Sequence, residues 1–149
     1  MLWRCHADFE RLMHKVYLSL GSNIGNRRET ILKAIEKIKE LVGNVDCQSA
    51  LYETEPWGFS SENMFINAAV RCITELTPRQ VLETTQRIEC ELGRVHKSIN
   101  AEYQDRIIDI DILLYDDCHI DEPDLKIPHP FMKERDFVMK PLNEILNKK

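Results

Sequence analysis

The sequence predicts an α+β fold: a ferredoxin-like βαββαβ core in which helices pack on an antiparallel sheet. Two kinds of segment support this class. Apolar residues at alternate positions, which are typical of strands, occur in four segments. Apolar residues at helical spacing occur in two longer segments, one between the first and second strands and one between the third and fourth.

The order of the elements is clear from these patterns. The strands are expected at residues 15–20, 45–54, 65–74 and 106–115, and the helices at 27–42 and 77–92. In the third strand, Ile66, Ala68 and Val70 face one way, and Asn67 and Ala69 face the other. Such alternation predicts a strand with a polar side chain on one face.

The ends of the helices carry local signals. Thr77, Pro78 and Gln80 form a capping box with proline at the first helical position, which predicts the start of the second helix. Gly93 is expected to end that helix, and Gly43 is expected to cap the first helix at its C-terminus.

The chain is long enough for one domain with a sizeable core, because it has 149 residues. We expect residues 15–149 to form this single domain, and residues 1–14 to be a loosely ordered N-terminal extension that precedes the first strand. The net charge of −5 argues against a general nucleic-acid-binding protein.

The cysteines and the apolar segments indicate a cytoplasmic protein. The five cysteines are scattered and form no CxxC pair, a pattern typical of reduced thiols. No apolar stretch approaches the ~20 residues needed to span a bilayer. We therefore expect no membrane partner, and the negative net charge likewise predicts no nucleic-acid partner. We further expect a monomer.

Two carboxylates interrupt the fourth strand. Asp109 and Asp111 are two residues apart in an apolar, β-branched segment, so they share one face of the strand, roughly 7 Å apart. Two like charges on a largely buried strand are costly unless a positive group lies between them. A divalent cation, an ion pair with Arg94 and Arg106, and a solvated strand end all remain open at this point.

If the pair binds a metal, its chemistry favours magnesium. Carboxylate oxygens without coordinating histidine or cysteine suit Mg²⁺ better than Zn²⁺, and Mg²⁺ completes its shell with waters and substrate phosphates. Arg87, Arg94, Lys97 and Arg106 lie near the pair in the sequence, and the planar guanidinium suits phosphate recognition. The expected partner is therefore a nucleotide.

With these residues in place, the chain resembles the 6-hydroxymethyl-7,8-dihydropterin pyrophosphokinase family over nearly all of its length except the N-terminal extension. The motifs that carry the resemblance are Leu20-Gly21-Ser22-Asn23, Tyr52-Glu53-Thr54, Phe65-Ile66-Asn67-Ala68-Ala69-Val70, Thr85-Gln86-Arg87-Ile88-Glu89, Gly93-Arg94, Arg106-Ile107-Ile108-Asp109-Ile110-Asp111-Ile112, Ile127-Pro128-His129 and Arg135-Asp136-Phe137.

The resemblance implies transfer of the pyrophosphoryl group of ATP to the hydroxymethyl oxygen of the dihydropterin, with release of AMP, in folate biosynthesis. It implies two Mg²⁺ ions on Asp109 and Asp111, and phosphate contacts from Arg94 and Arg106. The residues implied to line the ATP site are Gln86, Glu89, His96, Ile112 and His129. The residues implied to contact the pterin are Thr54, Trp57, Phe65, Asn67 and Phe137.

Some positions depart from the family pattern. His96 stands where a second arginine is common, Pro130 where a tyrosine is frequent, and Gln104-Asp105 where small residues or proline precede Arg106. These departures concern the ATP contacts. Two other functions remain as alternatives: a metal-dependent phosphodiesterase that uses the same carboxylates, and a non-catalytic RNA-binding module.

Overall fold

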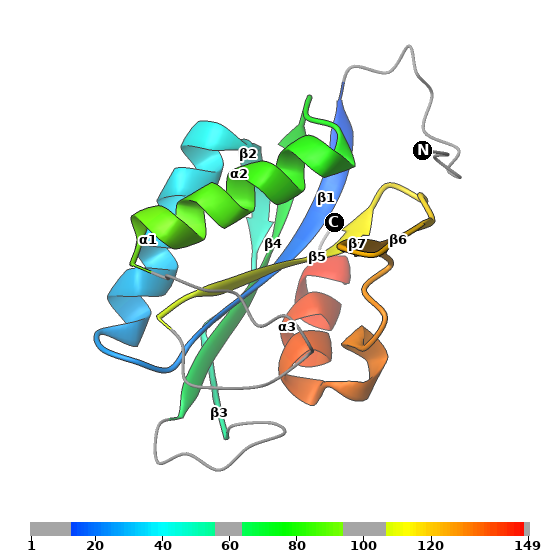
Figure 1. Cartoon of the computed structure of the whole chain (residues 1–149). Coiled ribbons are helices and arrows are strands. Elements are labelled where there is room, and N and C mark those ends of the chain that lie inside the picture. The colour runs from blue at the N-terminus through cyan, green and yellow to red at the C-terminus, as the bar shows by residue number, and fades with distance from the viewer. Residues whose placement is uncertain (1–12, 56–63, 94–106, 148–149) are drawn as a thin grey trace.

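The computed structural model describes residues 13–55, 64–93 and 107–147 of the chain (Figure 1). The elements in chain order are β1 (His14–Ser22), α1 (Arg27–Leu41), β2 (Gly43–Gln48), β3 (Tyr52–Thr54), β4 (Phe65–Thr74), α2 (Pro78–Glu91), β5 (Asp109–Tyr115), β6 (Ile120–Glu122), β7 (Leu125–Ile127), a 3₁₀ turn (Met132–Glu134) and α3 (Asp136–Leu146).

The main sheet has the strand order β2-β4-β1-β5, and β3 also pairs with β4. Every pairing in it is antiparallel. The predicted α+β fold with a βαββαβ core is thus confirmed. In this order β1 lies between β4 and β5, so residues of β1 can connect side chains from those two strands.

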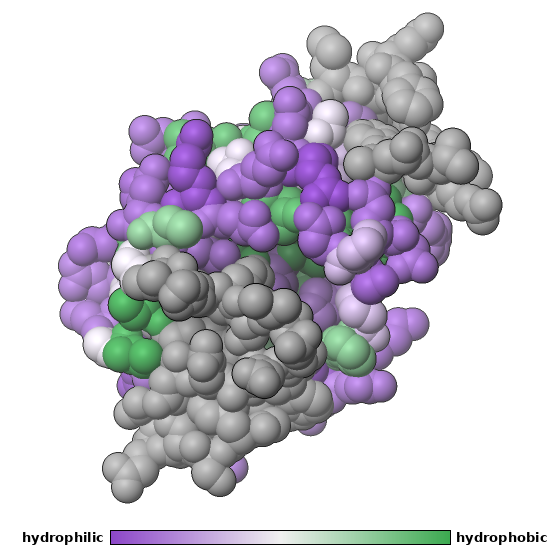
Figure 2. Space-filling view, in the orientation of Figure 1, coloured by the Kyte–Doolittle hydropathy of each residue, from purple (hydrophilic) through white to green (hydrophobic). Residues whose placement is uncertain are grey.

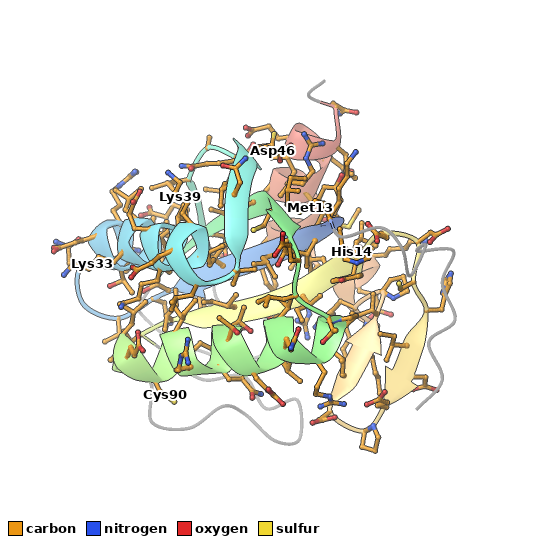
Figure 3. The ribbon with its side chains drawn as sticks, turned by 90° about the horizontal axis from the view of Figure 1, so that it is seen from above. Met13, His14, Lys33, Lys39, Asp46 and Cys90 are labelled. Carbon is orange, nitrogen blue, oxygen red and sulfur yellow. The ribbon has the colours of Figure 1, made fainter. Side chains whose placement is uncertain are left out.

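Helices α1 and α2 cover one face of the sheet and lie beside each other (Figures 1 and 3). The core between them contains Leu18, Val70 and Ile110 from the strands and Ile35 and Ile88 from the helices, all 2% exposed or less. Fully burying such a side chain contributes about 1.5–3 kcal/mol. The helical and alternating patterns in the sequence therefore correspond to one shared core.

Helix α3 covers the opposite face of the sheet, where it contacts β4, β1 and β3 (Figure 1). Val138, Leu142 and Ile145 from α3 pack against Ala69 and Leu113 of the sheet. The sheet therefore has an apolar cluster on each face, one beneath α1 and α2 and the other beneath α3.

The predicted strand at 45–54 is wrong as one continuous strand, because it is divided into β2 and β3. The interruption lies at Ser49, whose N–H donates to the Ala69 carbonyl and whose Oγ accepts from the Ala69 N–H, each at 2.9 Å. The hydroxyl here takes the place of a backbone carbonyl. Side chains that hydrogen-bond to the backbone compete with regular ladders in this way.

Gly43 is also not the helix cap that the sequence predicted. Val42 caps α1, and Gly43 is the first residue of β2. A Cβ atom at Gly43 would lie 2.1 Å from the Ile73 carbonyl oxygen on β4. Glycine is needed here for close approach of two strands rather than for a left-handed turn. The end of α2 agrees with expectation, since Gly93 has φ +107° after that helix.

We expect Gly43→Ala to lower the free energy of unfolding by about 2–3 kcal/mol, because the added methyl group meets backbone and forces β2 away from β4. Denaturant unfolding measures this change. The control is Asn44→Ala at the next, exposed position of β2, which should change stability by less than about 0.5 kcal/mol. Equal effects of the two substitutions would contradict the role given to Gly43.

The acidic segment 116–124 includes one strand of the β6–β7 hairpin. The guanidinium of Arg79 on α2 pairs with Glu122 and, at 2.7 Å, with Asp124. This cation offsets the acidic charge and joins the hairpin to α2. The sequence could not show the hairpin, since each strand has three residues.

Three further expectations concern the chain's ends, cysteines and apolar segments. Strand β1 begins at His14, and residues 1–12 of the predicted extension lie outside the described part. Cys47, Cys72 and Cys90 are free thiols, but Cys118 is disulfide-bonded, so the expectation of thiols throughout is wrong there. Within the described residues, no helix is long and apolar enough to cross a membrane. On the face of the molecule that Figure 2 shows, most of the described residues are hydrophilic.

Candidate active site

The two aspartates of β5 project from the face of the sheet opposite α1 and α2. They alternate with Ile110 and Ile112, which are 1% and 6% exposed and belong to the core beneath those helices. Asp109 and Asp111 themselves are half-buried. The structure therefore places both carboxylates on one face, as the period-2 pattern predicted.

Gly21 of β1 lies between the aspartate strand and the strand that carries Asn67. Its register partner is Asp109 on β5 and Asn67 on β4. Residues directly opposite each other in antiparallel strands project to the same face. Since neighbouring strands are about 4.8 Å apart, the Cα atoms of Asn67 and Asp109 are separated by roughly 10 Å across this row.

Gly21 leaves space for the Asn67 amide. A Cβ atom there would lie 3.1 Å from Asn67 Oδ1 and 3.7 Å from a ring carbon of Phe65. Gly21 is a strand residue, and its contribution is the absence of a side chain between the two groups of polar residues.

The Asn67 side chain is buried, at 2% exposed, and its orientation is fixed. Its Nδ2 donates to Thr54 Oγ1 on β3 at 2.6 Å. Thr54 is itself the register partner of Phe65, so β3 and β4 bring these three predicted pterin residues together. An amide held in this way presents its oxygen toward Gly21 as a hydrogen-bond acceptor.

Helix α3 brings an aromatic ring to the same side of the sheet. Phe137 in its first turn is half-buried and packs against the cluster that contains Ala69. The Arg135 guanidinium, which is 6% exposed, lies 5.4 Å from the Phe131 ring centroid and 5.9 Å from that of Phe137. Burial lowers the pKa of Arg135.

Glu89 connects α2 to the aspartate strand. It is 2% exposed, and its Oε2 accepts the Ile110 N–H at 2.7 Å. Because Ile110 lies between Asp109 and Asp111, this bond holds α2 against the part of β5 that bears the carboxylates. An acceptor at this position satisfies a backbone donor of the last strand in the sheet order.

Three other described residues were predicted to line the ATP site: Gln86, Ile112 and His129. The His129 N–H donates to the Leu113 carbonyl at 3.0 Å, and the Phe131 N–H donates to His129 Nδ1 at 3.2 Å. In a neutral ring this arrangement leaves the proton on Nε2. Gln86 is exposed on α2, whereas the Ile112 side chain is buried in the core, so a contact of Ile112 with ATP would use its backbone.

Four predicted site residues lie outside the described part of the chain: Trp57, Arg94, His96 and Arg106. Their predicted roles remain predictions.

The donors at the aspartate pair fit magnesium. Both residues are half-buried on one face and supply hard carboxylate oxygens, the type of ligand that Mg²⁺ prefers. Among the described residues, no group of three or more histidine, cysteine, aspartate or glutamate side chains could hold a metal ion. A two-carboxylate site matches an ion that takes its other ligands from water and phosphate.

Sequence reasoning missed a contact that holds β3 in place. Glu144 on α3 accepts from the Tyr52 hydroxyl and from the Ala50 N–H. The hydrogen bond to Glu144 raises the pKa of Tyr52. The signal available in the sequence was the Tyr52-Glu53-Thr54 motif, but nothing local indicated a partner 92 residues away.

Together, the split βαβ sheet, the carboxylate pair and the row of polar side chains across Gly21 fit an enzyme of the phosphoryl-transfer class. The family model of 7,8-dihydro-6-hydroxymethylpterin-pyrophosphokinase matches residues 17–147. The chain therefore belongs to this family. It is an enzyme that transfers pyrophosphate from ATP to hydroxymethyldihydropterin in folate biosynthesis.

Curated relatives agree with this assignment. The 2-amino-4-hydroxy-6-hydroxymethyldihydropteridine pyrophosphokinase of Porphyromonas gingivalis is 49% identical over 131 residues, which cover 87% of this chain and 89% of that protein. The Aquifex aeolicus enzyme of the same name is 44% identical over 133 residues, covering 89% and 81%.

Solved structures share the fold. The wild-type HPPK-DHPS protein of Plasmodium falciparum superposes with a TM-score of 0.72 at 17% identity, and the alignment covers 93% of this chain. The chain spans 42% of that longer protein. At this identity the likeness shows the fold alone.

Proposed function

We propose that the transfer takes place on the face of the sheet that bears Asp109, Asp111 and Asn67, with Mg²⁺ held by the two aspartates. The proposal rests on the register of Gly21, which puts Asn67 and Asp109 on the same face with their Cα atoms roughly 10 Å apart. We call the region beside Thr54, Phe65 and Asn67 the pterin slot. That separation suits a substrate whose ring lies in the slot and whose hydroxyl reaches the nucleotide phosphates.

The pterin side of the proposed site consists of Thr54, Trp57, Phe65, Asn67 and Phe137. Asn67 would hydrogen-bond the pterin edge with an amide whose orientation Thr54 fixes. The rings of Phe65 and Phe137 would stack on its faces, as flat heterocycles favour. The burial of Asn67 makes its hydrogen bonds selective, since an unmatched ligand would leave the amide without a partner.

The ATP side consists of Gln86, Glu89, His96, Ile112 and His129, with Arg94 and Arg106 as cationic groups for the phosphates. Glu89 holds α2 on β5 through the Ile110 N–H and so keeps the nucleotide side aligned with the carboxylates. Arg94 and Arg106 would stabilise the charge of the transition state, each contributing ~2–4 kcal/mol.

In the proposed reaction the hydroxymethyl oxygen of the pterin attacks the β-phosphorus of ATP in line, and the bond to the leaving AMP breaks. When bound, magnesium would neutralise the triphosphate charge. Asp109 and Asp111 would supply its carboxylate ligands. Phosphoryl-type transfer has a loose transition state, so the remaining task of the protein is to position the two substrates.

The expected test result is AMP, and not ADP, when the protein is incubated with ATP, Mg²⁺ and hydroxymethyldihydropterin. Chelating the metal with EDTA should lower the rate to background, and added Mg²⁺ should restore it. Nucleotides are separated by chromatography. AMP formed equally well without the pterin would favour a phosphodiesterase and contradict the proposal.

We further propose a cytoplasmic monomer in which the extension ends before His14, since that residue already belongs to β1. Three of the four cysteines in the described part of the chain, Cys47, Cys72 and Cys90, are free thiols, as a reducing compartment favours, and the disulfide-bonded Cys118 is the exception. Light scattering tests the monomer, for which the mass is 17.5 kDa, and limited proteolysis tests the extension.

A further inference from the structure

Arg27, the first residue of α1, joins two segments that lead into the pterin slot. Its Nη1 donates to the Met64 carbonyl oxygen at 2.6 Å, and its Nη2 donates to Glu53 Oε2 at 3.1 Å. Met64 immediately precedes Phe65 on β4, and Glu53 immediately precedes Thr54 on β3. One guanidinium thus connects the end of β3 with the start of β4.

The backbone that carries Arg27 is itself well anchored. The Asn26 side chain caps α1 by accepting the Glu29 N–H at 3.2 Å, and its Nδ2 donates to Glu29 Oε2 at 2.9 Å. The Thr30 hydroxyl donates to the Asn26 carbonyl oxygen at 2.9 Å. A helix start held by these bonds is a fixed base from which the Arg27 side chain can position other groups.

Strand β3 is short, so contacts from outside the sheet help to fix its position. It has only three residues, and in the main sheet it pairs with β4. Glu144 holds the start of the strand, where it accepts from the Tyr52 hydroxyl and from the N–H of Ala50 just before β3. Arg27 acts at the opposite end, beside Thr54, whose hydroxyl accepts from the Asn67 amide.

The two contacts of Arg27 differ in strength. The side chains of Arg27 and Glu53 are 31% and 52% exposed, so their ion pair is screened by solvent and contributes little to stability. The bond to the Met64 carbonyl is partly buried, and a charged donor strengthens it. Arg27 is therefore suited to fix the local geometry rather than to hold the whole fold together.

We propose that Arg27 is a positioning residue of the pterin site: by joining Glu53 to Met64 it sets the distance between Thr54 and Asn67, and so the orientation of the amide that receives the pterin. This inference rests on the proposed function, which places the pterin at Asn67. It assigns Arg27 a selective effect on the pterin and none on ATP.

The test compares Arg27→Ala and Arg27→Lys with the unchanged enzyme, measuring KM for both substrates, kcat, and pterin affinity by fluorescence. Arg27→Ala should raise the pterin KM about ten-fold and leave the ATP KM within about two-fold. Arg27→Lys should show a smaller rise in the pterin KM, because an ammonium can still donate to the Met64 carbonyl but lacks the fork that also reaches Glu53.

The matched control is Lys37→Ala on the same helix. The Lys37 side chain is 34% exposed and pairs with Glu91 on α2, away from β3, so both KM values should stay unchanged. Equal changes in the two KM values of Arg27→Ala, or no change in either, would overturn the proposal. Thermal unfolding confirms that each variant is folded, and Arg27→Lys provides the test if the alanine variant is not.

Asn67→Ala, measured in parallel, separates this inference from the proposed function. If Asn67→Ala raises the pterin KM and Arg27→Ala does not, only the positioning role of Arg27 is wrong. If Asn67→Ala also leaves the pterin KM unchanged, the pterin site itself is wrong, and the inference falls with it.

Discussion

Replacing Asp111 or Asp109 with asparagine is expected to lower kcat about 1000-fold, because each change removes a carboxylate ligand of the proposed metal site. Metal ions stabilise transition-state charge by several kcal/mol, and each 1.36 kcal/mol corresponds to a factor of ten in rate. Asparagine has nearly the same size as aspartate, so the half-buried strand should tolerate it. Steady-state assays of AMP release at saturating ATP and pterin measure the loss.

Two further measurements sharpen this result. Asp121→Asn is the control, since Asp121 is an exposed acid of the β6–β7 hairpin that pairs with Lys126, and its activity should stay normal. Titration with Mg²⁺ in the presence of a non-hydrolysable ATP analogue should show weaker metal binding in the Asp109 and Asp111 variants. Near-normal turnover in both variants would refute the metal assignment.

Asn67→Ala is expected to weaken pterin binding about 100-fold and to leave ATP binding unchanged. The substitution removes a buried amide whose bond to Thr54 Oγ1 fixes the hydrogen-bonding edge of the slot. The loss of hydrogen bonds in a buried site costs about 1–3 kcal/mol, which reaches a factor of about 100 in affinity. Equilibrium fluorescence titration with the pterin measures the change.

Gly21→Ala tests the same slot without removing a polar group. Its added methyl would press on Asn67 Oδ1, so pterin affinity should fall while the Asn67 amide is still present. Asn44→Ala, at an exposed position of β2, is the control for the loss of an amide. If Asn67→Ala weakens ATP and pterin binding equally, the slot does not bind the pterin selectively.

How much of the site could be predicted depends on the range of the signals. The face shared by Asp109 and Asp111 follows from strand periodicity, and the capping box at Thr77 follows from residues three apart, so both were predictable. The limits of β4, Phe65–Thr74, also agree with prediction, since its alternation is regular along the whole strand. Each of these features is determined by near neighbours in the sequence.

Features that depend on distant partners were not predictable in this way. The break between β2 and β3 requires Ser49 to bond with Ala69, and Gly43 is needed because Ile73 lies against it. The hairpin β6–β7 is joined to α2 by Arg79, which lies 43 residues from Glu122 in the sequence. In each case a residue far away in the sequence changes what the local pattern would favour.

By itself, the sequence determined the class of fold, the βαββαβ order of its core and the shared face of Asp109 and Asp111, because hydrophobic periodicity and capping act within a few residues. Only the tertiary structure decided that Gly21 lies between Asp109 and Asn67, that α3 occupies their side of the sheet, and that Arg27 joins β3 to β4. The physical reason is that strand register and helix placement are set by packing between residues far apart in the chain, which no local pattern records.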